Sequence, residues 1–248
     1  MNNLRILCRR EWRRLVRLPA GWMPLAAGIA LFTLLFAQKI TQTGQIDPMA
    51  VLWSTALLPA LALSAALLAS QCFCFDRESG LSELMASTAI PSGQIVLSKY
   101  LPLVAFLHLQ MALTLTVPLL ILPRFGSQRL VCGSWPCWGA DALLLGTACA
   151  LLAAIVLLVS LLFKSRSACT AAALVICCGL PLAAGQILPT WFPDSLARIE
   201  WFSPYAQLGD AGTGLLHLTH PLCTLLLASL LLRYTIVRYE CLRLRGRL

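Results

Sequence analysis

The chain has 248 residues, of which 59% are hydrophobic and 12% are charged. Soluble domains carry about 25% charged residues, so the composition excludes an ordinary soluble domain and predicts an all-α polytopic membrane protein. The net charge of +9 would be high enough for a nucleic-acid-binding protein. However, the lysines and arginines lie beside the ends of hydrophobic runs, and we expect no nucleic-acid partner.

The N-terminal segment, residues 1–18, interleaves six arginines with apolar residues. Leu4, Leu7, Leu15 and Leu18 recur near helical spacing, and the arginines occupy the remaining arc. This pattern predicts a basic amphipathic helix, the elbow helix, that lies on an anionic membrane surface, so membrane lipid is an expected partner. The side chains that we expect at this surface are Arg9, Arg10, Trp12, Arg13 and Arg14.

Six uncharged runs follow the elbow helix, and each is long enough to cross a membrane. A bilayer core of about 30 Å takes roughly 20 residues of helix. Because lipid offers the backbone no hydrogen-bond partners, we expect six transmembrane helices and one membrane domain over residues 1–248. Pro59 can kink the second of these helices. The six runs are 18–38, 48–75, 100–123, 142–163, 167–193 and 211–232.

The positive charges between the runs predict the orientation of the chain. If the N-terminus is cytoplasmic, 15 of the 19 lysines and arginines lie on the cytoplasmic side, as the positive-inside rule requires. Six crossings then return the C-terminus to the cytoplasm. Between the fifth and sixth runs, segment 190–210 mixes aromatic and charged residues, and we expect short interfacial or re-entrant helices there on the outer side.

Eleven cysteines raise the question of metal sites and disulfides. Most of them lie within predicted spans, where cysteine serves as a small apolar residue. Cys72 and Cys74 form a C-x-C pair without further ligands nearby, so we expect no metal site. Cys132 and Cys137 share a predicted external loop, where an oxidising compartment permits a disulfide. The alternative is two free thiols at the membrane interface.

The sequence contains no signature of an enzyme or of an ion-driven carrier. The common hydrolase and metalloprotease motifs are absent. His217 and His220 share a helix face but lack nearby carboxylates for a metal site, and His108 is expected to be a structural histidine. Charged residues avoid the span interiors, which disfavours a proton- or sodium-driven carrier. Asp141 and Asp210 lie at outer span boundaries, where we expect them to reach water or to cap helices.

The largest polar insertion between the predicted spans is segment 76–99. Acidic residues near its start suit a helix N-terminus, and Leu81, Leu84, Met85 and Thr88 lie at helical spacing on one side. We therefore expect a cytoplasmic helical hairpin whose apolar side can seat in a groove of a soluble partner. The alternative is an ordinary loop whose charges only set the topology.

Nine positions of segment 76–99 follow one pattern: Asp76, Arg77, Glu78, Gly80, Glu83, Leu84, Met85, Ile95 and Lys99. This pattern resembles the intracellular segment of the type-2 ABC transporter (ABC-2 family) exporter permeases, approximately E-[KR]-E-x-G-T-L-E-x-L-L…P…I-x-x-x-K. Leu81 and Ser82 replace the usual Thr and Leu, and Ala89 stands where the family commonly has Pro. The elbow helix, the six spans, the interfacial segment and the WFSP run at 201–204 resemble that family as well.

The resemblance implies the transmembrane permease subunit of an ATP-binding cassette exporter in a bacterial inner membrane, with both termini cytoplasmic. It implies a translocation pathway formed with a second permease copy or a paralogue and driven by a dimer of separate ABC ATPase subunits. The chain has no phosphate-binding G-x-x-x-x-G-K-[ST] loop, so the partner ATPase would bind the ATP and Mg²⁺, and this chain would hold no cofactor and no catalytic residue.

Two alternatives stay open: a permease of the haem-export (cytochrome c maturation) type, and a non-transporting membrane scaffold or assembly factor. In the permease interpretation, the ATPase-coupling interface comprises Asp76, Arg77, Glu78, Gly80, Glu83, Leu84, Met85 and Lys99.

Overall fold

The computed structural model describes residues 2–17, 19–43, 49–88, 90–121, 135–179 and 218–245. Within these ranges the regular elements are all helical, and no strand occurs among them. The helices are α1 (Asn2–Arg17), α2 (Pro19–Thr43), α3 (Met49–Ala69), a π-helical turn (Ser70–Cys74), α4 (Phe75–Glu78), α5 (Leu81–Ser87), α6 (Ser92–Ile121), α7 (Trp135–Leu162), α8 (Arg166–Leu174), a second π-helical turn (Val175–Gly179) and α13 (Thr219–Leu244).

Five of these helical stretches are long and apolar enough to cross a membrane, and they overlap five of the six predicted spans. They are Gly21–Lys39, Leu52–Glu78, Ser92–Val117, Trp138–Leu162 and Thr219–Leu244. The remaining predicted span, 167–193, is described only in its first part, as the shorter apolar helix Arg166–Gly179. The interfacial segment 190–210 lies outside the described residues.

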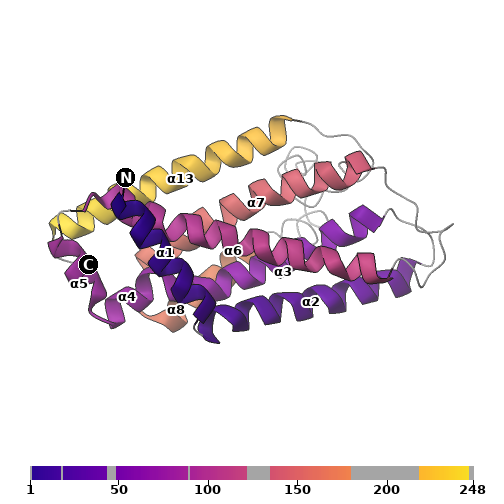
Figure 1. The fold of residues 1–248 in the computed structure, drawn as a ribbon, viewed down its shortest axis with the longest axis horizontal. Coiled ribbons are helices and arrows are strands. Elements are labelled where there is room, and N and C mark those ends of the chain that lie inside the picture. The colour runs from indigo at the N-terminus through magenta and orange to yellow at the C-terminus, as the bar shows by residue number, and fades with distance from the viewer. Residues whose placement is uncertain are drawn as a thin grey trace, which may run out of the picture.

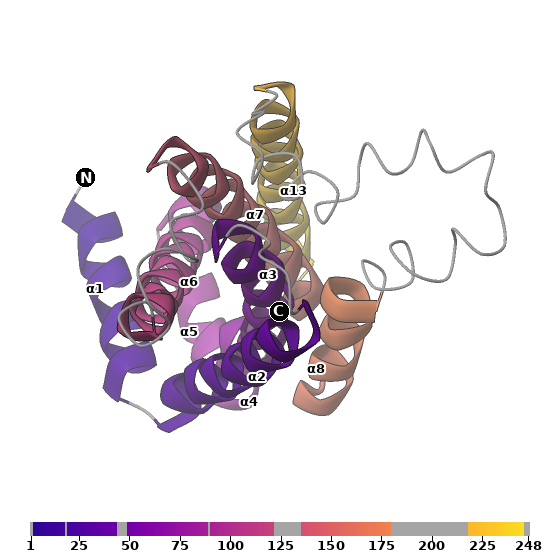
Figure 2. The same ribbon diagram turned by 90° about the vertical axis from the view of Figure 1, so that its right-hand side faces the viewer.

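The long helices run side by side, and α1 crosses the bundle near one end (Figure 1). This end also holds α4, α5 and the last turns of α13, and we call it the hairpin end. Viewed along the bundle, α3 lies at the centre, with the other long helices and α8 around it (Figure 2). The central position of α3 follows from its small side chains, because Ser64, Ala65, Ala66 and Ala69 let neighbouring backbones approach closely.

Three spans, α2, α3 and α6, approach one another closely at Gly28. The Ser64 hydroxyl of α3 lies 2.9 Å from the carbonyl oxygen of Pro24 in α2. From α6, the amide nitrogen of Gln110 donates to the Ala60 carbonyl oxygen at 3.5 Å. The side chains of Ser64 and Gln110 are fully buried. Hydrogen bonds between spans therefore supplement apolar packing at this junction.

The second predicted span has a kink at Cys72. Pro59 lies inside the regular helix α3. Cys72 has non-helical angles (φ −82°, ψ −111°) within the π-helical turn Ser70–Cys74. π-helical turns often lie at functional sites and bends. The bend sets the direction in which α4 leaves the bundle.

Segment 76–99 comprises most of α4, α5 and the first turns of α6. Gly80 separates α4 from α5 with a φ of 69°, a left-handed conformation that glycine adopts without strain. The expected apolar side of the hairpin divides into two environments: Leu84 is 68% exposed and Thr88 is also exposed, whereas Met85 is buried against the bundle.

Candidate functional site

Four charged side chains from three helices meet at the hairpin end, and we call them the ionic cluster: Glu11 and Arg14 of α1, Asp76 of α4 and Lys99 of α6. The Arg14 guanidinium lies 2.9 Å from one carboxylate oxygen of Asp76 and 3.3 Å from Glu11. The Lys99 ammonium lies 3.4 Å from Glu11 and also pairs with Asp76. The four side chains are between 2% and 14% exposed. The cluster is thus a closed ring of alternating charges.

Helical spacing explains how α1 supplies two members of the ring. Glu11 and Arg14 lie three residues apart and therefore share one side of α1. The Arg14 guanidinium also lies 3.8 Å from the centre of the Phe75 ring and donates to the Gln71 carbonyl oxygen. Each buried charge of the ring has an opposite charge beside it, which offsets its lost hydration.

The charges of the ring change the pKa of the Glu11 carboxyl. Burial by itself would raise the pKa of the Glu11 carboxyl, but Lys99, Arg14 and Arg10 together hold this pKa below its ordinary value. The ionised carboxylate therefore stabilises the folded chain. This contribution is complete above the ordinary pKa of glutamate and is lost as the pH falls through the lower folded-state value.

We expect Glu11→Gln to lower the unfolding free energy by about 1–3 kcal/mol at neutral pH, because charge-assisted hydrogen bonds are lost. The difference from the parent should close in acid, where Glu11 is protonated in both folded and unfolded chains. Thermal unfolding of the chain in lipid nanodiscs over an acidic pH series measures this. Glu240→Gln is the control, because Glu240 is exposed on α13. A difference that does not change with pH would contradict the assignment.

The other charged residues of α4 tie it to α7 and α8. Arg77 donates to the carbonyl oxygens of Phe163 at 2.8 Å and Leu161 at 2.7 Å. These carbonyls lie at the C-terminal end of α7 and on the residue that follows it, where a helix lacks internal donors and favours a cation. Glu78 pairs with Arg166 of α8 at 2.5 Å. One short helix is therefore bonded to α1, α6, α7 and α8.

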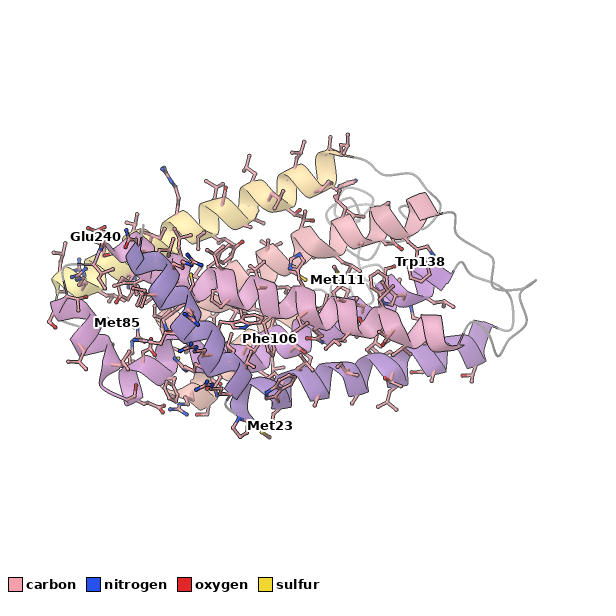
Figure 3. The ribbon with its side chains drawn as sticks, viewed as in Figure 1. Met23, Met85, Phe106, Met111, Trp138 and Glu240 are labelled. Carbon is pink, nitrogen blue, oxygen red and sulfur yellow. The ribbon has the colours of Figure 1, made fainter. Side chains whose placement is uncertain are left out.

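The connection between α5 and α6 is held by the last span. Arg243, in the final turn of α13, donates to the Ile90 carbonyl oxygen at 2.8 Å and also to that of Thr88. One turn earlier on α13, the ring of Tyr239 packs against that of Phe73 with centroids 5.4 Å apart. The hairpin therefore contacts α13 as well. Figure 3 shows Met85 and Glu240 at this same end of the molecule.

The structure divides the predicted coupling residues into two groups. Glu78, Gly80 and Leu84 are exposed, whereas Asp76, Met85 and Lys99 are buried and Arg77 is partly buried. The side chain of Glu83 lies outside the described part of the chain. The buried members attach the hairpin to the bundle, and the exposed Glu78 does so through its ion pair with Arg166. Gly80 and Leu84 are exposed without such a contact among the described residues.

The predicted membrane-surface residues divide in a similar way. Arg9, Arg10 and Arg13 are exposed and Trp12 is partly buried on α1. Arg14 differs from the prediction, because its side chain is 14% exposed and belongs to the ionic cluster. Sequence reasoning missed Glu11 altogether. The available signal was its position as a single acidic residue among six arginines.

The remaining candidates carry no reactive site in the described residues. The His108 ring nitrogen Nδ1 lies 2.8 Å from the Val104 carbonyl oxygen of its own helix, a structural contact. Cys72 and Cys74 are buried free thiols. Cys132, His217, Asp210 and the side chain of Cys137 lie outside the described residues, so the predicted disulfide stays a prediction.

The charged side chains at the hairpin end bind the hairpin to the helix bundle. Among the residues that the structure describes, no group of three or more His, Cys, Asp or Glu side chains could hold a metal ion. The charged groups are used in ion pairs and helix-end contacts. No model of a known protein family matches the chain, and no curated protein or solved structure matches it either.

Proposed function

We propose that this chain is the transmembrane permease subunit of an ABC exporter and that a separate ATPase drives it. The proposal depends most on one observation: a polar hairpin that joins the second and third predicted spans is bonded to α1, α6, α7, α8 and α13. A partner that moves this hairpin would move most of the membrane domain. The resemblance of segment 76–99 to type-2 exporter permeases points in the same direction.

The docking surface for the ATPase is formed by the outer side of α5 and the residues that follow it. Leu84 is a large apolar side chain, 68% exposed, on a polar segment outside the membrane-crossing stretches. Ser87, Thr88 and Pro91 are exposed beside it in sequence. An exposed leucine flanked by small and polar residues fits an apolar groove on a soluble partner. In this proposal the hairpin end lies on the cytoplasmic side of a bacterial inner membrane.

Transmission relies on the buried group of residues. ATP can shift the permease between two states only if the ATPase contacts those states differently. Asp76, Arg77 and Arg243 do not touch the partner in this proposal. They hold α4 and the connection between α5 and α6 against the spans, so a displacement of α5 reaches α6, α7 and α13. The Cys72 bend is the point at which α4 can pivot against α3. A second permease copy would complete the translocation pathway.

We expect Leu84→Glu to reduce association with the ATPase at least about tenfold, because a charge replaces the apolar anchor of the interface. The measurement uses the tagged full chain, expressed in its own organism and purified in mild detergent. Nucleotide hydrolase activity is then assayed in the eluate. Leu244→Glu is the matched control, since Leu244 is 82% exposed on α13 at the same end of the molecule.

The expected result is hydrolase activity that co-purifies with the parent and with the control but not with Leu84→Glu. Two outcomes would count against the proposal. The parent chain could elute without any nucleotide hydrolase, as a scaffold protein would. Alternatively, the Leu84→Glu chain could retain the hydrolase, in which case the docking surface lies elsewhere.

A further inference from the structure

Asp141 is an acidic side chain sealed inside the membrane-crossing part of the molecule. It lies in the second turn of α7, within the span Trp138–Leu162, and is 0% exposed. The expectation that it reaches water or caps a helix is therefore wrong. Within the described ranges, neither of its carboxyl oxygens has a hydrogen-bond partner of good geometry. It also forms no ion pair with the residues that the structure describes.

The surroundings of Asp141 are aromatic and weakly polar. Trp138, one turn earlier on α7, packs against Trp53 of α3 with ring centroids 5.7 Å apart. The Trp53 indole nitrogen is buried and has no hydrogen-bond partner in the described part of the chain. Next to it in sequence, Ser54 is fully buried and its hydroxyl lies beside the Asp141 carboxyl. Trp138 lies at the end of the bundle opposite the hairpin end (Figure 3).

The titratable groups on neighbouring helices already have other contacts. Lys39 of α2 lies 2.7 Å from the Thr55 hydroxyl. His108 of α6 contacts the Val104 carbonyl oxygen and lies near Gly146 of α7. On α13, which packs along α7, His220 is buried at 9% exposure and has a contact of its own. None of the three forms an ion pair with Asp141 among the described residues.

An ionised carboxylate in this position would have no compensating cation among the described residues, and an uncompensated charge in a low-dielectric interior is very costly. A protonated carboxyl is neutral, and its O–H can donate to a neighbouring oxygen. We infer that Asp141 is a proton-binding site: it carries H⁺ on its carboxyl while α3 and α7 are packed together.

This site adds a proton-binding group to a chain whose sequence disfavoured a proton-driven carrier. An intramembrane acid usually marks a proton or ion pathway, and Asp141 is the acid that the described spans bury without an opposite charge. The inference does not depend on the ATPase, because it concerns only the packing of α3 against α7. It is therefore tested on the purified chain alone.

The test is infrared spectroscopy of the full chain in lipid nanodiscs, with aspartate labelled by ¹³C at the side-chain carboxyl. A protonated aspartic acid in an apolar site gives a carbonyl stretching band well separated from that of a carboxylate. We expect this band in the parent at neutral pH, shifted by the label, and lost in Asp141→Asn. Asp194→Asn, another of the aspartates in the sequence, should keep it. Asp141→Glu should replace the label-shifted band with an unshifted carboxylic acid band, because only aspartate carries the label.

Three results would overturn the inference. The labelled band could be absent from the parent at neutral pH, which means that Asp141 is ionised. The band could persist in Asp141→Asn, which means that another aspartate carries the proton. The band could disappear when Na⁺ is added at constant pH, which would make Asp141 part of a metal-cation site. Replacing Na⁺ with choline provides the comparison.

Discussion

Replacing Asp76 by alanine should lower the unfolding free energy of this chain by about 3–5 kcal/mol, the usual cost of removing one partner from a buried ion pair. Asp76 is 3% exposed at its side chain and pairs with both Arg14 and Lys99. Without it, two buried cations share the single carboxylate of Glu11. We therefore expect the elbow helix to detach from α4 and α6 before the spans unfold.

The control for Asp76→Ala is Glu78→Ala. Glu78 also lies in α4 and also pairs with an arginine, but its side chain is 43% exposed and that of Arg166 is 38% exposed. Exposed pairs contribute about 0–1 kcal/mol. Denaturant unfolding in detergent, followed by helical circular dichroism, compares the two variants. Proteolysis within α1 reports its detachment. Equal destabilisation by both substitutions would show that burial of the ionic cluster contributes little.

A double-mutant cycle separates the ion pair from other effects of the substitution. Arg14→Met keeps much of the contact with Phe75 while removing the charge. If Arg14 and Asp76 act as a pair, the double variant should lose much less stability than the sum of the two single variants. Additive losses would mean that the two residues act independently.

Gly28→Ala should destabilise the chain strongly, although it adds only one carbon atom. A Cβ atom at Gly28 would lie 2.0 Å from the Ser64 hydroxyl oxygen and 2.2 Å from the Gln110 amide nitrogen. It would also lie 3.1 Å from the Ala60 carbonyl oxygen, which belongs to the backbone and cannot turn aside. The added carbon would therefore separate α2 from α3 and α6, at about 1–3 kcal/mol for the overpacking. The loss of the hydrogen bonds between these helices would add to this.

Gly93→Ala provides a matched control, since it makes the same chemical change in another helix. No described atom lies within 4 Å of a Cβ atom at Gly93, which is in the first turn of α6. Alanine is a better helix former than glycine by up to about 1 kcal/mol, so this variant should be neutral or slightly more stable. Thermal unfolding in nanodiscs compares the two. If Gly28→Ala were as stable as Gly93→Ala, the close packing of α2, α3 and α6 at Gly28 would be contradicted.

Sequence alone determined where most of the helices lie. The lipid environment explains this, because an uncharged run of about 20 residues in lipid has to form its backbone hydrogen bonds within itself, as a helix. Five runs became helices of sufficient length and apolarity. The amphipathic segment at the N-terminus became α1 for a related reason, since its apolar residues recur on one side. The polar insertion after the second span was likewise found from its charge alone.

Tertiary structure decided which charged residues meet. Arg14 and Asp76 are separated by 62 residues, and Lys99 and Glu11 by 88. Helical periodicity tells which residues share a side of one helix, but it does not tell which other helix lies against that side. For this reason Arg14 was expected at the membrane surface and Glu11 was overlooked. The bend at Cys72 had no proline to mark it, so it too emerged only from the packed bundle.

The burial of Asp141 has the same physical origin. Its position near the start of a span is compatible with contact to water or with enclosure, and the rotation of α7 against α3 decides between them. That rotation is set by packing, including the contact between Trp53 and Trp138. Hydrophobic runs are a property of the chain and can be found one segment at a time. The partners of a buried charge are a property of the assembled bundle, because they depend on helix rotations that all the spans determine together.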